Sequence, residues 1–172
     1  MRFLSIVLIL FSSNVLFASA ARATSEDCFE TNGTSTITKF LCGYSGDTRV
    51  VVPKSIRGMT VTEIGPHAFS HMALTNVELP DGLKSIGSWA FSGNQLEDLV
   101  LPLGLVSIGD VAFGWSQLKS VAFPNTVVSI GEAAFRGNQL THVALPDSVT
   151  TLGDGVFEEN MLEDVKIGRA HV

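Results

Sequence analysis

The stretch Ile86-Gly87-Ser88-Trp89-Ala90-Phe91 recurs along the chain at a constant step of 22 residues. Other copies begin with the same kind of residue and end on phenylalanine: they run over 64–69, 108–113, 130–135 and 152–157. A proline stands in the same register four times, at Pro80, Pro102, Pro124 and Pro146. Self-similarity at a short fixed period is the signature of a solenoid, in which each repeat buries its apolar side against its neighbours.

Each repeat is predicted to contain two short extended segments and one helical turn. Val77 and Leu79 alternate with polar neighbours, which is the pattern of a strand with one buried face. Pro80 ends this strand because it has no backbone N–H. A second extended segment is expected at 84–86, followed by a sharp turn at Gly87 and a helical turn over 88–91. Stacked repeats would pair their strands about 4.8 Å apart and align their phenylalanines in a ladder.

Residues 1–23 have the three parts of a secretory signal peptide, namely Arg2, an apolar run and small residues before the cleavage site. The alternative is a transmembrane anchor. Polar residues at 12–14 interrupt the apolar run, which is shorter than the roughly 20 residues that a spanning helix needs. We therefore expect an exported protein that is secreted or held at the cell surface, or periplasmic in a Gram-negative host.

Residues 24–48 precede the regular repeats and are expected to form an N-terminal cap. They contain both cysteines of the chain, Cys28 and Cys42. An even pair of cysteines close together in an exported chain predicts a disulfide, with two free thiols as the alternative. Asn32 begins an N-glycosylation acceptor sequence, which matters only in a eukaryotic host.

The composition excludes several partner classes. The formal charge of −6 comes without any basic stripe, so nucleic acid is not expected as a partner. Insertion into a membrane and a bound cofactor are not expected either. One exported domain over residues 49–166 is predicted.

The last residues, 167–172, resemble the translation of a common sequencing adapter. The register of the prolines predicts proline at position 168, where Gly168 stands. We therefore expect residues 167–172 to be an artefact of a truncated gene. A last repeat left uncapped by truncation would promote self-association.

An apolar strand ending in Leu-Pro and followed by Ile-Gly-x-x-Ala-Phe resembles the BspA-like leucine-rich repeat family over about residues 49–164. The resemblance implies a leucine-rich repeat solenoid. It also implies an exported or surface protein, since members of this family are implicated in adhesion to host proteins or to other microbes. Leu152 and Val156 depart from the pattern, so the last repeat is expected to be looser.

The outward positions of the predicted strands form the candidate binding surface for a protein or glycan ligand. This strand face consists of Asn76, Glu78, Asp98, Val100, Ser120, Ala122, His142 and Ala144. A rigid sheet would hold such a surface without an ordering cost. Trp89 and Trp115 are candidate aromatic anchors on its flank.

Signals for catalysis or metal binding are weak. Ser120, His142 and Asp164 occupy one column and could form a hydrolase triad, but no oxyanion loop or substrate pocket accompanies them. His67 and His71 have a spacing suited to zinc without a third ligand, so no metal site is predicted. We predict a non-enzymatic scaffold for protein binding or cell adhesion. The alternative is a targeting or binding segment of a longer exported enzyme that is truncated here.

Overall fold

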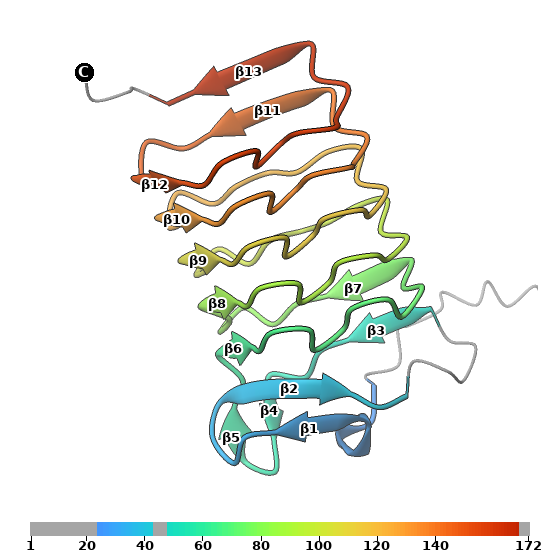
Figure 1. Ribbon diagram of the computed structural model, residues 1–172. Helices are drawn as coiled ribbons and strands as arrows, with labels where there is room; N and C mark the ends of the chain where they lie inside the picture. Colours follow the sequence, from blue (N-terminus) through green and yellow to red (C-terminus); the bar gives the residue numbers. More distant parts are fainter. Residues whose placement is uncertain (1–23, 43–47, 169–172) are drawn as a thin grey trace, which may run out of the picture.

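The computed structural model describes residues 24–42 and 48–168. The predicted signal peptide and residues 169–172 lie outside this part. The described chain winds into a solenoid whose coils stack along one axis, with the N-terminal module at one end and the last strand at the other (Figure 1). Stacked coils of about 22 residues confirm the predicted repeat architecture.

A seven-stranded sheet runs through the whole solenoid in the order β1-β2-β6-β8-β9-β10-β12. Its first two strands form an antiparallel hairpin, and the other five are parallel. The bounds are Phe29–Thr31 for β1, Thr36–Phe40 for β2, Glu63–Ile64 for β6, Ser85–Ile86 for β8, Ser107–Ile108 for β9, Ser129–Ile130 for β10 and Thr151–Leu152 for β12. The second extended segment of each repeat therefore builds the continuous ladder.

The strands before the prolines pair less regularly than the sequence predicts. They were expected to form a continuous ladder, but they pair in twos, and a single bridge joins Val100 to Ala122. The pairs are β3 (Arg49–Val51) with β7 (Asn76–Glu78) and β11 (His142–Leu145) with β13 (Asp164–Ile167). The remaining elements are the hairpin of β4 (Ser55–Ile56) and β5 (Met59–Thr60) and the 3-10 helix η1 (Glu26–Cys28).

Glycine explains why the coils approach each other most closely beside the seven-stranded sheet. A Cβ atom added to Gly109 would lie 2.6 Å from the backbone nitrogen of Ser88 and 2.8 Å from the carbonyl carbon of Gly87. Only glycine fits such a contact between backbones. The segments before the prolines have no such glycine column. Their backbones are therefore not held at the distance that hydrogen bonding between strands requires.

The helical turn predicted over 88–91 is wrong. Trp89 has a positive φ of 61°, which interrupts a right-handed helix. The amide of Trp89 donates to the carbonyl of Asp110, and that of Phe91 donates to the carbonyl of Ala112, each at 2.8 Å. Bonds to the next coil replace the bonds that a helix would form within the segment.

Stacked phenylalanines form the centre of the core. Four rings are fully buried: Phe69, Phe91, Phe113 and Phe135. The centroids of successive rings lie 4.9–5.4 Å apart. Phe40 of the N-terminal module continues this ladder at 5.3 Å from Phe69. The module, residues 24–42, thus covers the first repeat with the same kind of ring.

A buried asparagine closes each of several coils. The Nδ2 amide of Asn94 donates to the carbonyls of Phe69 and Phe91 at 2.8 and 2.7 Å, and its Oδ1 accepts the amides of Met72 and Leu74 at 3.1 and 3.0 Å. One side chain thereby satisfies four backbone groups from two coils. Such groups would be costly if they were buried without partners.

Ser116 interrupts this asparagine column between Asn94 and Asn138. Its hydroxyl is buried and makes no hydrogen bond to the residues that the structure describes. We expect Ser116→Asn to stabilise the protein by about 1 kcal/mol, because the longer amide can reach the backbone as Asn138 and Asn160 do. Urea denaturation measures the change, with Ser120→Asn as the exposed control. Destabilisation by Ser116→Asn would show that the site has no room for the amide.

The predicted disulfide is confirmed: Cys28 and Cys42 are bonded across a separation of 14 residues. The loop-entropy model gives about 3 kcal/mol of stabilisation for a loop of this length. We expect the double variant Cys28→Ser/Cys42→Ser to lose roughly that free energy of unfolding. Reducing agent should lower the stability of the wild type and leave the double variant unchanged. Equal urea midpoints for oxidised and reduced wild type would contradict the prediction.

Candidate functional site

Each coil has three sides, which differ in what they expose. In the coil of residues 74–95, the strand face lies at 76–79, the sheet face at 84–87 and the turn face at 88–93. The two columns of labelled strands in Figure 1 mark the strand face and the sheet face. The three faces are the surfaces available to a partner.

The strand-face residues point outward as predicted. Val100 is 82% exposed, and seven of the eight predicted residues are exposed, whereas Asn76 is half-buried. The bridge between Val100 and Ala122 and the register pair of His142 with Asp164 place successive coils in one column. The result is an exposed surface that is acidic at Glu78 and Asp98 and apolar beside them. Its role in binding stays a prediction.

One ion pair beside the strand face links neighbouring coils. The Nζ of Lys119 lies 2.6 Å from a carboxylate oxygen of Glu97. The hydrogen bond that Lys119 donates to Glu97 raises the pKa of Lys119, and the negative charges of Glu97 and Asp98 act in the same direction. Within residues 24–42 and 48–168, neither Asp98 nor Glu78 makes an ion pair. Both carboxylates are exposed, and Asp98 lies close enough to Lys119 to raise its pKa by charge.

The arrangement of Ser120, His142 and Asp164 is not that of a triad. The Nδ1 of His142 lies 3.0 Å from the hydroxyl of Thr141, its neighbour in sequence. No hydrogen bond joins Ser120 to His142 in the described part of the chain. Asp164 pairs with His142 through backbone register, and its carboxylate lies 3.9 Å from the ammonium of Lys166. The column therefore contains no serine activated by a base.

The tryptophans belong to a stacked row on the turn face. The ring centroids of His67 and Trp89 lie 6.0 Å apart, and those of Trp89 and Trp115 lie 5.9 Å apart. The guanidinium of Arg136 lies 5.9 Å from the Trp115 centroid on the same row. Gly137 makes room, because a Cβ atom there would lie 2.6 Å from Trp115. The rings thus cover one another's faces and present mainly edges to solvent.

Two glutamates fix the end of this row. Arg136 contacts Glu159 at 2.6 Å and Glu158 at 3.0 Å. The hydrogen bond from Arg136 lowers the pKa of the Glu159 carboxyl, and a hydrogen bond from Trp115 acts in the same direction. The same bond raises the pKa of Arg136. The arginine is held against the tryptophan by charge on its other side.

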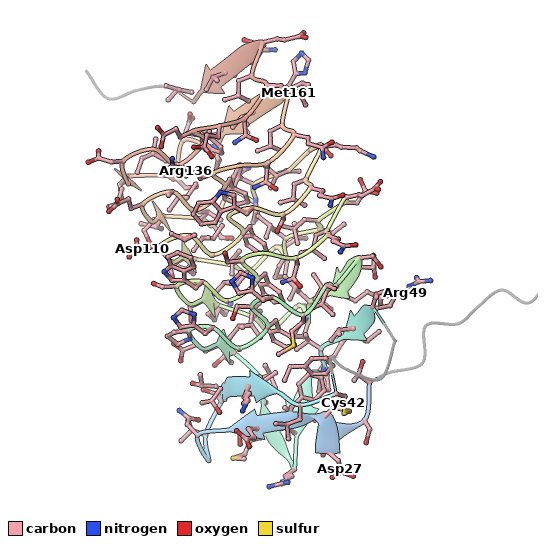
Figure 2. All side chains as sticks on the ribbon, turned by 45° about the vertical axis from the view of Figure 1, so that its right-hand side comes forward. Asp27, Cys42, Arg49, Asp110, Arg136 and Met161 are labelled. Atoms are coloured by element: carbon pink, nitrogen blue, oxygen red, sulfur yellow. A yellow bond between two sulfur atoms is a disulfide. The ribbon has the colours of Figure 1, made fainter. Side chains whose placement is uncertain are left out.

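The structure does not place the tryptophans on the strand face. Figure 2 shows Asp110 and Arg136, which belong to the turn face, on the opposite edge of the solenoid from Arg49 of the first strand-face strand. A partner on the strand face would have to reach around a corner of the coil to touch Trp89 or Trp115. The two predicted groups are therefore separate surfaces.

Comparison with known proteins agrees with this geometry. The family model of the BspA type leucine rich repeat region matches six copies over residues 50–170. The chain belongs to this family. Its structure is similar to that of a T. pallidum leucine-rich repeat protein, at 30% identity and a TM-score of 0.73, covering 84% of this chain and 71% of the other. Comparison with curated proteins gives no match.

Two further solved structures share the fold. A leucine-rich repeat protein from Eubacterium ventriosum is 24% identical with a TM-score of 0.67, and the match covers 80% of this chain and 38% of that one. The pneumococcal vaccine antigen PcpA is 22% identical with a TM-score of 0.60, and the match covers 82% of this chain and 47% of that one. The chain thus spans less than half the length of these two proteins.

A groove on the sheet face of the BspA-type coils was missed by the sequence reasoning. It has a volume of about 380 Å³, and its lining includes Ser88 and a column of three serines, Ser85, Ser107 and Ser129, beside the glycine column. The signal was present in the sequence, since a serine precedes the isoleucine in three successive repeats. No charged side chain other than Glu63 and Asp110 lines it.

The two histidines with a spacing suited to zinc lie on the turn face of the first full coil. His67 and His71 have positive φ values of 57° and 55°, so they do not share a helical face. Among the described residues, no group of three His, Cys, Asp or Glu side chains is placed to hold a metal ion. In the same part of the chain, no helix is long and apolar enough to cross a bilayer.

Proposed function

We propose that this chain is an exported, non-enzymatic scaffold that binds a partner protein through its strand face. The observation that carries this proposal is the exposure of Val100 on a surface whose neighbours in the same column are the small residues Ala122 and Ala144. Small side chains around an exposed apolar one let a partner approach closely and bury it. A few residues near the centre of an interface, where neighbouring contacts exclude water, carry most of the binding energy.

The rigidity of the scaffold supports this function. Coils are joined by backbone bonds on the turn face, by the seven-stranded sheet and by buried asparagines. A surface fixed in this way loses little conformational entropy when a partner binds. The strand face is therefore preorganised.

Two features support an extracellular or periplasmic location. The first is the signal-peptide pattern of residues 1–23. The second is the disulfide between Cys28 and Cys42, a bond typical of proteins in oxidising compartments. Adhesion to another cell would use the strand face in this setting.

A protein ligand fits the surfaces better than a glycan. Sugars commonly pack an apolar face against an open aromatic ring, but the faces of Trp89 and Trp115 are covered by His67, by each other and by Arg136. The strand face has no aromatic residue besides His142 at its predicted positions. A protein partner needs neither an open tryptophan face nor an aromatic residue on the strand face.

Surface plasmon resonance against a panel of extracellular matrix and bacterial surface proteins tests the proposal. We expect Val100→Glu to weaken binding to any captured protein by at least about tenfold, because a charge then enters the apolar centre. Thr38→Glu, an exposed substitution on β2 of the N-terminal module, is the matched control and should bind as the wild type does. Equal binding by Val100→Glu, or no binding to any panel member, would contradict the proposal.

A further inference from the structure

We infer that the partner presents lysine or arginine side chains to a patch centred on Val100 and Leu103. This inference rests on the proposed function and specifies the chemistry of the partner. The patch, here called the apolar corner, wraps from the strand face to the sheet face of neighbouring coils. It consists of Val100, Leu103, Val106, Ala122 and Val128.

One coil alone carries the centre of this patch. Val100 and Leu103 are 82% and 83% exposed, the highest values among the exposed large hydrophobic side chains. The same columns carry polar or small residues in the neighbouring coils: Glu78, Ala122 and Ala144 beside Val100, and Asp81, Asn125 and Asp147 beside Leu103. The exposure is therefore specific to this coil and is not a property of the repeat.

Folding does not account for these two side chains. Apolar groups that stay in water contribute little to stability. Valine is favoured in strands, but Leu103 lies in the loop after Pro102, where no such preference applies. The carbonyl of Leu103 accepts a hydrogen bond from the hydroxyl of Thr126 at 2.8 Å. The backbone is thus fixed while the side chain remains outside the core.

Two carboxylates border Val100. Glu78 occupies the same column in the preceding coil, and Asp98 lies two residues earlier on the same face. Neither makes an ion pair in the described chain, whereas the adjacent Glu97 is matched by Lys119 at 2.6 Å. Lys84 lies on the sheet side of the corner, with its amine 3.4 Å from the carbonyl of Gly104. The strand side of the patch therefore carries two carboxylates that form no salt bridge within the described residues.

Lysine and arginine combine the two properties that this surface requires. Their aliphatic stems can lie along Val100 and the small Ala122 while the cationic head reaches Glu78 or Asp98. Complementary charge also speeds association and disfavours acidic partners. A purely apolar partner would leave the two carboxylates partly desolvated and unpaired, which is costly.

A second copy of the chain does not fit this patch. A contact between two copies through this patch would place Glu78 and Asp98 of both copies, four carboxylates, in one interface. The chain as a whole has a formal charge of −6, so long-range repulsion acts in the same direction. The occupant is therefore a different, basic protein.

Selection of random linear peptides displayed on phage against the full chain tests the inference. Binders to the double variant Val100→Ser/Leu103→Ser are removed by counterselection, and enriched peptides are synthesised for calorimetry. We expect them to be rich in lysine or arginine and to lose about tenfold in affinity between about 0.05 and 0.5 M salt. The double variant Glu78→Gln/Asp98→Asn should bind these peptides about tenfold more weakly. The double variant Glu132→Gln/Asp154→Asn, which changes exposed acids elsewhere, should bind them as the wild type does.

The outcomes separate the inference from the proposed function. Acidic or neutral peptides whose binding depends on Val100 and Leu103 but not on salt would overturn the inference and leave protein binding by the strand face in place. No enrichment after counterselection would overturn both, since every binder would then be independent of Val100 and Leu103. Circular dichroism of each variant confirms that loss of binding is not loss of fold.

Discussion

Replacing Asn94 with alanine is expected to lower the free energy of unfolding by about 4 kcal/mol. The side chain is 3% exposed and bonds four backbone groups, two from each of two coils. Alanine leaves these groups buried without partners, and each such group costs roughly 1–3 kcal/mol. Water entering the cavity would relieve part of this cost. Urea denaturation followed by circular dichroism measures the loss.

Asn125→Ala is the matched control for this substitution. Asn125 is exposed at the corner after Pro124, and no hydrogen bond from its side chain is present in the described structure. We expect a change within about 0.5 kcal/mol for the control. Similar losses for Asn94→Ala and Asn125→Ala would mean that the buried amide is replaceable and that sheet and core packing alone hold the coils.

Phe113→Ala is the second large effect, also expected to cost about 4 kcal/mol. Its ring is fully buried between Phe91 and Phe135, with centroid distances of 5.3 and 5.4 Å. Deletion removes the apolar contacts and leaves a cavity that stacked coils cannot easily close, for which phenylalanine to alanine changes typically cost 3–5 kcal/mol. Because coils contact only their neighbours, the loss should also broaden the transition by uncoupling the two halves of the solenoid.

Phe157→Ala provides the comparison at the last coil. Phe157 is partly exposed and stacks on Phe135 at 5.9 Å. We expect less than half the loss seen for Phe113→Ala, since less area is buried and fewer contacts vanish. Denaturation curves monitored by both tryptophan fluorescence and circular dichroism would reveal any uncoupling. Equal losses at the two positions would show that position along the ladder does not matter.

The candidate surface could be predicted in part from local pattern. Alternation around Val77 identified the outward positions, because a strand with one buried face has period two. Val100 and Ala122 are exposed for that reason. The prominence of Leu103 was not predicted, since a loop residue has no periodic pattern to follow. Its exposure depends on how the corner after Pro102 packs.

The stacking of the two tryptophans could not be predicted from the columns of the sequence repeat. Trp89 and Trp115 occupy different columns of the repeat, so register alone does not bring their rings together. They stack at 5.9 Å because Gly137 leaves space beside Trp115 and Arg136 holds its other flank. Contacts between long side chains in different columns depend on the rotamers of those side chains and on whether a neighbouring position leaves space, as Gly137 does.

The sequence by itself determined the solenoid, its period and its inward residues, because a pattern repeated every 22 residues buries itself only by stacking. The pairing of Cys28 with Cys42 followed from the same local reading. The tertiary structure alone decided that the segments after the prolines form the continuous sheet and that residues 88–91 bond forward to the next coil instead of forming a helix. Both depend on how closely two backbones approach, which is settled by glycine contacts between coils and by left-handed residues such as Trp89.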